Sequence, residues 1–379
     1  MSGARENQLI TGPQTWWTRI RRSIDWVVVL LAAGIVTLAL INLNSAEEGD
    51  WAGKFTRDQL RMVALGTFLM AGVAAMDYRV FYRVAYPAYA IGFGFVLLVN
   101  IVGVTTNNAT RWLDVGFFRF QPSELMKLLL VLGLARYLHR LGRKDGRRTL
   151  IQTLVLPGLL VLVPALLIIR QPDLSTGIIL ILIALSVLAV TELDLKTLLA
   201  LLSGGAITFM VAWSFFLQDY QTKRVDVWLD PEAHPDEAYQ IVQARTAVGN
   251  GGFFGRGVGQ GTQNVLDFVP YKESDFSFAV FAEEWGFVGS TMLLALYMSL
   301  VLWAINLASQ ARDRFAACLC VGIGAMFLWH SVLNVGVVLE FFPNTGLPLP
   351  FFSHGGSNVV TMMLALGVLM SVSRSRKWR

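Results

Sequence analysis

The sequence predicts an all-α polytopic membrane protein with about ten transmembrane helices and one long extracytoplasmic loop. Of its 379 residues, 55% are hydrophobic and only 15% are charged. So few charged side chains could not cover the apolar side chains of a soluble domain of this length. About ten spans of about 20 residues take up roughly 200 residues, which matches the apolar share. A β-barrel is not expected, because the apolar runs are continuous and long rather than alternating.

Ten apolar segments define the expected spans, because each is long enough for a helix that crosses the hydrocarbon core. They lie near residues 24–43, 59–77, 82–104, 122–139, 150–169, 174–192, 196–217, 275–305, 314–340 and 355–373. The first span is too long for a cleaved signal peptide, and too many others follow it. We therefore expect one membrane domain, residues 24–373, between an N-terminal tail, 1–23, and a C-terminal tail, 374–379.

Basic residues determine the expected orientation. If the N-terminus is cytoplasmic, most of the 31 Lys and Arg residues fall on the cytoplasmic side, and many of the others lie in one long loop. Both termini and residues 136–149 are then cytoplasmic, and residues 218–274 are extracytoplasmic. The basic residues punctuate apolar segments, so a nucleic-acid partner is not expected. Cys318 and Cys320 lie in an apolar run, which excludes a disulfide framework and a zinc cluster.

Three charged residues stand out around the second outer loop and the helix that follows it. Arg111 lies in the loop, and Pro122 suits the first turn of the next helix. Glu124 suits the positive end of that helix, whereas Lys127 does not. The two are spaced to form an ion pair. Lys127 is therefore either half of a structural pair or a cation aimed at an anionic headgroup at the outer surface.

A run of glycines from Gly249 to Gly261 lies in the long outer loop. It lacks the preceding strand and the following Lys-Ser/Thr of a nucleotide-binding loop, so nucleotide binding is not favoured. A tight re-entrant or surface loop is expected, because glycine permits positive φ and close backbone approach. Non-helical backbone near a bilayer must be buried or line a water-filled cavity.

Three carboxylates lie at the start of the eighth span. Asp275 opens it and is either a helix cap or a catalyst. Glu283 and Glu284 lie two turns deeper, where carboxylates face a cavity or a partner. Helical geometry turns Glu283 about 80° from Asp275 and Glu284 about 180°. Glu283 is thus the better candidate for a cavity shared with Asp275, and a salt bridge to another helix is the alternative.

Several other polar residues have structural explanations. Asp173 is most simply the cap of the sixth span. His330 and Asn334 are expected to form hydrogen bonds between helices rather than bind a metal, because no further His or Cys shares their face. A Ser-His-Asp triad around His354 has no supporting spacing.

The polar residues gather on the expected outer side, where acid and base lie next to one another. This combination suits an anionic lipid-linked substrate, because phosphates bind Arg and Lys and a hydroxyl nucleophile needs a carboxylate base. A proton-coupled transporter is the competing class. Such a transporter usually shows broken helices in two related halves, which the sequence does not show.

At these motifs the sequence resembles the SEDS family (shape, elongation, division and sporulation proteins). The resemblance covers nearly all of residues 20–373, and the short chain and Gln171 favour the elongation branch over the division branch. The matching segments are Arg111-Trp112-Leu113, Gln121-Pro122-Ser123-Glu124 with Lys127, Gln171-Pro172-Asp173-Leu174, Tyr239-Gln240 with Gln243-Ala244, residues 255–263, Asp275-Phe276 with Glu283-Glu284, and Leu347-Pro348-Leu349-Pro350-Phe351. The sequence departs from the family pattern at Thr110, Glu273-Ser274, His354 and Asn358.

The resemblance implies a peptidoglycan glycosyltransferase of the bacterial cytoplasmic (inner) membrane. Such enzymes polymerise lipid II at the outer face for elongation and rod shape, together with a class B penicillin-binding protein and the elongation machinery. The family's essential aspartate corresponds to Asp275, which is expected to act as general base in an inverting reaction.

The resemblance also suggests roles for the neighbouring residues. Arg111 and Lys127 would stabilise the diphosphate of the substrate, while Glu124 and Glu283 orient these groups. A divalent cation, Mg or Mn, is a candidate to share that work, and no organic cofactor is expected. Two other functions stay open, a lipid II flippase and a non-catalytic scaffold for cell-wall synthesis.

Overall fold

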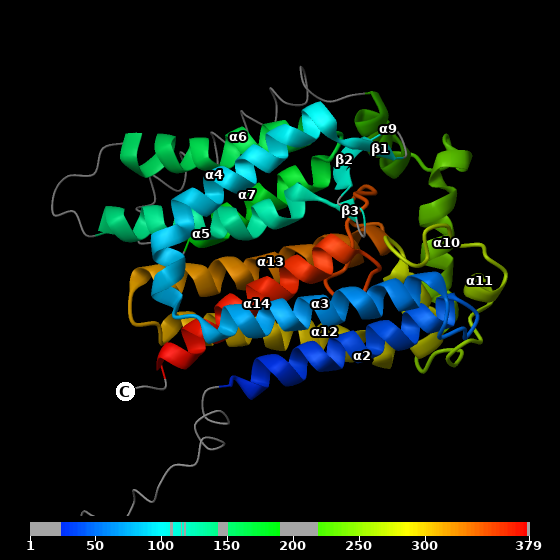
Figure 1. Cartoon of the computed structure of the whole chain (residues 1–379). Helices are drawn as coiled ribbons and strands as arrows, with labels where there is room; N and C mark the ends of the chain where they lie inside the picture. The colour runs from blue at the N-terminus through cyan, green and yellow to red at the C-terminus, as the bar shows by residue number, and fades with distance from the viewer. Residues whose placement is uncertain are drawn as a thin grey trace, which may run out of the picture.

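A computed structural model describes residues 24–106, 109–114, 116, 119–142, 151–189 and 219–376. Most of these residues form long helices that run side by side (Figure 1). The helices are α2 (Trp26–Ala46), α3 (Lys54–Ala75), α4 (Tyr78–Val102), α5 (Pro122–Gly142), α6 (Leu156–Arg170), α7 (Leu174–Ala189), α12 (Ser277–Ser309), α13 (Arg314–Val338) and α14 (Gly356–Arg376). A π-helical turn, Ile151–Val155, leads into α6.

The expected spans coincide with these helices wherever the chain is described. Five of them, α2, α4, α12, α13 and α14, are long and apolar enough to cross a membrane, and α6 and α7 are shorter apolar helices. The expected span at 196–217 and the tail at 1–23 lie outside the described residues. The last helix continues to Arg376, beyond the expected end at 373, and residues 377–379 are again outside the described part.

The centre of the bundle is α13, which packs against α5, α7, α12 and α14. Small residues let the helices approach closely. A Cβ atom added at Gly322 of α13 would lie 2.5 Å from a methyl carbon of Val131 on α5. In α14, a Cβ atom at Gly367 would lie 2.8 Å from the carbonyl oxygen of Met70 on α3. Glycine at these two positions therefore allows the helices to pack at this distance.

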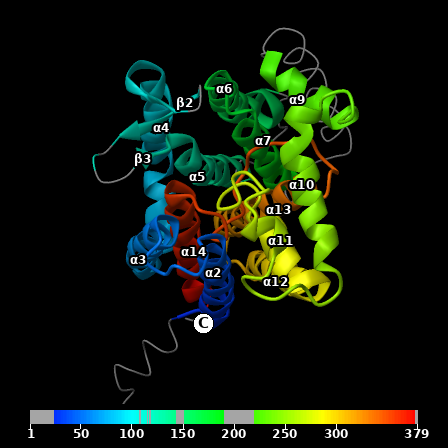
Figure 2. The ribbon, with the colours of Figure 1, turned by 90° about the vertical axis from the view of Figure 1, so that its right-hand side faces the viewer.

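Short strands and three further helices gather at one end of the bundle, on the right in Figure 1 and facing the viewer in Figure 2. The strands β1 (Val104–Thr106), β2 (Ala109–Asp114) and β3 (Arg119–Phe120) form an antiparallel sheet in that order. The helices are α9 (Asp219–Leu229), α10 (Pro235–Gly251) and α11 (Thr262–Val265). These strands were not predicted from the sequence, because segments of two to six residues show no clear alternation.

The glycine-rich segment pairs with a break in α12. Gly286 has φ 63° and ψ −162°, which interrupts the helix, and the freed backbone groups bond to residues 252–257 instead. The amides of Arg256 and Gly257 donate to the carbonyls of Glu283 and Glu284, respectively, both at 3.0 Å. In the opposite direction, the amide of Phe287 donates to the carbonyl of Gly252 at 2.9 Å, and that of Val288 donates to the carbonyl of Phe253 at 3.1 Å. The expected tight loop is therefore the segment that satisfies the backbone of a broken helix.

Candidate active site

A small cavity of about 60 Å³ opens at the end of the bundle that carries the strands. Two guanidinium groups line it, from Arg111 on β2 and Arg224 on α9. Arg111 Nε donates to the carbonyl of Gln171 at 3.2 Å, and Arg224 Nη1 donates to the carbonyl of Asn344 at 3.1 Å. We call this space the arginine cavity. Its two cations are suited to a phosphate-bearing ligand.

Asp275 lies beside the arginine cavity, in the turn that precedes α12. A Cβ atom added at Gly346 would lie 3.4 Å from Asp275 Oδ2 and 4.0 Å from Arg224 Nη1, so carboxylate and guanidinium approach the same point. Gly346 has φ 64°, a conformation that favours glycine. The N-cap of α12 is Phe276, which makes no capping bond through its side chain. The structure therefore does not support the alternative that Asp275 is a helix cap.

The environment of Asp275 raises the pKa of its carboxyl group above the ordinary value. Burial raises the pKa of Asp275 to about 6, and the neighbouring Glu273 carboxylate contributes to the increase. Arg224, a hydrogen bond from Ser274 and Arg111 act in the opposite direction. A carboxylate that titrates near neutral pH is well matched to accept a proton from a hydroxyl group.

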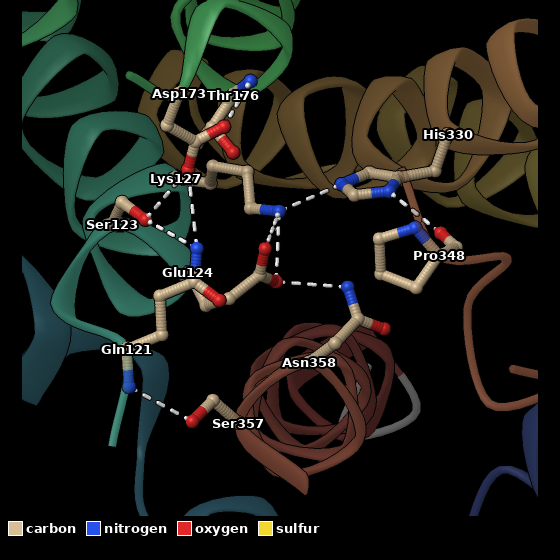
Figure 3. A network of polar contacts seen from close by, with 10 residues as sticks. All are labelled: Gln121, Ser123, Glu124, Lys127, Asp173, Thr176, His330, Pro348, Ser357 and Asn358. Carbon is tan, nitrogen blue, oxygen red and sulfur yellow. Dashed lines mark hydrogen bonds and ion pairs between the residues drawn. The ribbon is translucent and has the colours of Figure 1, made fainter. Parts of the chain in front are cut away.

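Glu124 and Lys127 form the predicted ion pair, which Figure 3 shows in the interior of the bundle. Lys127 Nζ lies 2.8 Å from both carboxylate oxygens of Glu124 and 2.8 Å from Nε2 of His330. Asn358 on α14 donates to Glu124 at 2.8 Å. The side chain of Lys127 is 0% exposed and does not line the arginine cavity. Contact between Lys127 and a substrate phosphate would require this network to open.

Asp173 caps α7, as expected. Its carboxylate accepts from the amide of Thr176 at 3.2 Å. It also accepts from Gln121 Nε2 at 3.1 Å and from the Ser123 hydroxyl at 3.4 Å. Because Gln121 and Ser123 stand at the start of α5, this cap also ties α5 to α7 (Figure 3).

Glu283 does not share a cavity with Asp275, contrary to expectation. It is buried and accepts from the Thr262 hydroxyl at 3.0 Å and from the amide of Gln263 at 3.1 Å. The helical rotation that placed it beside Asp275 does not apply, because Asp275 lies in a turn rather than on α12. The alternative salt bridge is also absent among the described residues. Glu283 instead holds the start of α11.

Arg224 was not among the predicted site residues. It lies beside Lys223 in the long outer loop that follows the expected span at 196–217. A helical interpretation of residues 219–229 would have grouped it with Gln221 and Trp228, which are three and four residues away on one face. Gln221 and Arg224 both line the arginine cavity, and Trp228 Nε1 donates to the carbonyl of Glu340 at 2.8 Å.

The described residues do not build a metal site beside Asp275. No group of three or more His, Cys, Asp or Glu side chains in the described part of the chain is arranged to hold a metal ion. Arg224 and Arg111 already face the carboxylate of Asp275. The expected Mg or Mn ion therefore stays a prediction.

Known proteins are similar to this chain in both sequence and fold. Residues 22–378 match the profile of the FtsW/RodA/SpoVE family, described as cell cycle proteins. The peptidoglycan glycosyltransferase MrdB of Escherichia coli K12 is 34% identical over 365 residues, which cover 96% of each chain. Stage V sporulation protein E of Bacillus subtilis strain 168 is 33% identical over 375 residues, covering 95% of this chain and 100% of that protein.

Two solved structures have the same fold. The rod shape determining protein RodA of Thermus thermophilus superposes with a TM-score of 0.70 at 31% identity, over 94% of this chain and 98% of the other. A chain from a peptidoglycan synthase complex that coordinates polymerisation and crosslinking superposes with a TM-score of 0.79 at 32% identity, over 94% and 99%.

Proposed function

This chain belongs to the FtsW/RodA/SpoVE family of peptidoglycan glycosyltransferases, and on that premise we propose that it polymerises lipid II with Asp275 as the general base. The observation that carries the proposal is the meeting of Asp275 and Arg224 at Gly346, beside a cavity that Arg111 also lines. A base and two cations are the groups that a hydroxyl acceptor and a diphosphate leaving group require.

In this mechanism Asp275 accepts the proton of the sugar 4-hydroxyl of the acceptor. The oxygen attacks the anomeric carbon of the donor, the bond from that carbon to the diphosphate breaks, and polyprenyl diphosphate leaves. A single displacement inverts the anomeric configuration. Arg111 and Arg224 stabilise the negative charge that develops on the diphosphate, and Asp275 releases its proton to water afterwards.

The buried charged residues have a different role in this proposal. Glu124, Lys127 and Glu283 expose almost no surface, so they act by holding other groups rather than by touching substrate. This assignment keeps the orienting role expected for Glu124 and Glu283. Lys127 was expected to contact the diphosphate, but in this proposal it binds Glu124 and His330 inside the protein instead.

We assign the protein to the elongation branch, with a class B penicillin-binding protein as partner. The similarity to MrdB and RodA supports the branch, and the similarity to a chain of a synthase complex that also crosslinks supports the partner. Co-purification with the class B penicillin-binding protein of the same operon or genome tests this pairing. Failure of every such protein to co-purify or to stimulate polymerisation would contradict it.

The orientation is also a proposal: α9–α11 and the strands face outward, and both termini lie in the cytoplasm. It is tested with single cysteines at Asp236 on α10 and at Arg312 between α12 and α13, in a background that lacks Cys318 and Cys320. An impermeant maleimide should label position 236 and not position 312 in intact spheroplasts. The reverse pattern would remove the arginine cavity from the outer face.

The catalytic role is tested with purified protein, its partner and labelled lipid II. Asn keeps the size of Asp and most of its hydrogen bonds but accepts no proton. Asp275→Asn should therefore reduce polymer formation by about 10² to 10⁴ while expression and partner binding stay normal. A variant that keeps more than about a tenth of the wild-type rate would contradict the general-base role. Transfer of lipid II across vesicles without polymer would favour the flippase instead.

A further inference from the structure

Two residues on α13 hold the loop that brings Gly346 to Asp275. His330 and Asn334 are four residues apart and lie on one face of the helix. The amide nitrogen of Asn334 lies 2.9 Å from the carbonyl oxygen of Asp275 and 2.7 Å from that of Leu347. His330 Nδ1 lies 3.2 Å from the carbonyl oxygen of Pro348. One amide group thus joins the turn of Asp275 to the loop, and the imidazole binds the loop one residue further on.

The partners of His330 fix which ring nitrogen carries the proton. Lys127 Nζ lies 2.8 Å from Nε2, and an ammonium group has donors but no acceptor. Nε2 must therefore accept, and Nδ1 must carry the hydrogen that is donated to Pro348 (Figure 3). The carboxylate of Glu124 binds the same ammonium through both oxygens at 2.8 Å. The chain of contacts from Glu124 to Pro348 is directional, and its three side chains, Glu124, Lys127 and His330, are buried.

We propose that His330 and Asn334 are positioning residues that hold residues 343–350 against Asp275, so that its carboxylate faces Arg224 across Gly346. The proposal rests on the proposed role of Asp275 as general base. It also explains how the buried Lys127 contributes to the reaction without touching substrate, because the ammonium keeps the His330 ring in the form that donates to the loop.

Release of this loop would change the surroundings of Asp275 in a defined direction. Burial is the main cause of the raised pKa of Asp275. The charged groups that face it are Arg224 from α9, Arg111 from β2 and Glu273 from its own turn. Asp275 is half-buried, and if the loop moves away more of its carboxylate is exposed to water, so its pKa falls toward the ordinary value. The acidic limb of the pH–rate profile then moves to lower pH, which a simple loss of folded protein would not cause.

Two substitutions at His330 separate the two ring nitrogens. Asparagine places an amide nitrogen near the position of Nδ1 and keeps the donor to Pro348, whereas glutamine places its amide near Nε2 and keeps only a partner for Lys127. We expect His330→Asn to polymerise lipid II within about threefold of the wild type. His330→Gln should lose about 10- to 100-fold in kcat, as a misplaced catalytic group does, and should shift the acidic limb to lower pH.

A second arm uses Asn334, in case His330→Gln folds poorly. Asn334→Asp keeps the shape but replaces the donor that joins two carbonyls by an acceptor, so it should show the same fall in kcat and the same shift. The control is Ser331→Ala on the same helix, because the buried Ser331 hydroxyl has no hydrogen-bond partner among the described residues. It should match the wild type in rate and pH profile.

The outcomes are distinct. Equal activity of His330→Asn and His330→Gln, or reduced rates with an unchanged pH profile in both His330→Gln and Asn334→Asp, would overturn the inference. Polymer formation by Asp275→Asn, measured alongside, would instead contradict the proposed function on which the inference rests.

Discussion

Replacing Arg224 by glutamine removes the cation that does most to lower the pKa of Asp275. The carboxyl group of Asp275 titrates at about pH 6 with Arg224 in place. Without that positive charge the ionised form is less stable, so the pKa of Asp275 must rise. At pH 6 to 7 a larger fraction of the enzyme then carries a protonated Asp275, which cannot accept the proton of the acceptor hydroxyl.

The size of the effect follows from the geometry at Gly346. The point where its Cβ would lie is 3.4 Å from Asp275 Oδ2 and 4.0 Å from Arg224 Nη1, so these atoms are at most about 7.4 Å apart. At that separation two unit charges interact by about 0.6 kcal/mol with a dielectric constant of 80 and by about 2.2 kcal/mol with 20. At 1.36 kcal/mol per pKa unit, Arg224→Gln should raise the pKa of Asp275 by roughly 0.4 to 1.6.

The assay is the pH dependence of kcat/KM for polymerisation of labelled lipid II, from pH 5 to 8.5. This parameter reports the ionisation of the free enzyme. The acidic limb should move to higher pH by the amount given, and kcat/KM should also fall at every pH because the diphosphate loses a cation. Lys223→Gln is the matched control: it removes the same charge from α9, but Lys223 is exposed and pairs with Glu237. An acidic limb that stays in place in Arg224→Gln, or moves equally in Lys223→Gln, would refute this account of the site.

Two further predictions concern buried groups, and both are measured by thermal unfolding. Lys127→Met leaves the buried carboxylate of Glu124 without its cation and should destabilise the protein by about 3 to 5 kcal/mol. Adding Glu124→Gln removes that unpaired charge and should restore most of the lost stability. No recovery in the double variant would contradict the ion pair. Gly286→Ala should abolish folding or cost more than about 3 kcal/mol. The combination of φ 63° and ψ −162° at this position is essentially confined to glycine, and the new Cβ would lie 2.3 Å from the amide nitrogen of Gly255. Gly249→Ala is its control and should be neutral or slightly stabilising, since nothing lies within 4 Å of the added atom, and equal stability of the two variants would be inconsistent with the break in α12.

The long apolar helices were predictable from sequence, because a span needs a continuous apolar run and nothing else. The pairing of Glu124 with Lys127 followed from their spacing of three residues, and the hydrogen-bonding role of His330 and Asn334 followed from the lack of a third metal ligand. Burial of the pair was not predictable, because the spacing does not show which neighbouring helices cover it. His330 and Asn358 come from α13 and α14, far away in sequence.

The geometry around Asp275 was the least predictable part. The resemblance to a family indicated the residue, but its surroundings come from four separate segments of the chain. Arg224 lies in a polar loop where hydropathy does not indicate which face of a helix points inward. Gly346 could be recognised only once its positive φ and its approach to Asp275 were known. The prediction that Glu283 shares a cavity with Asp275 was wrong, because it extended helical geometry across the turn that contains Asp275.

The break at Gly286 also explains how the chain can cross a bilayer close to two adjacent acidic residues, Glu283 and Glu284. If α12 were one continuous helix, its 33 residues would measure about 50 Å, far more than the roughly 30 Å of hydrocarbon in a membrane. The portion from 287 to 309 is about 35 Å long and crosses that thickness by itself. The preceding short portion carries Glu283 and Glu284, whose carbonyls accept hydrogen bonds from Arg256 and Gly257. Both carboxylates are buried within the protein, so the lipid need not accommodate them, and the glycine-rich segment holds the short portion that follows the Asp275 turn.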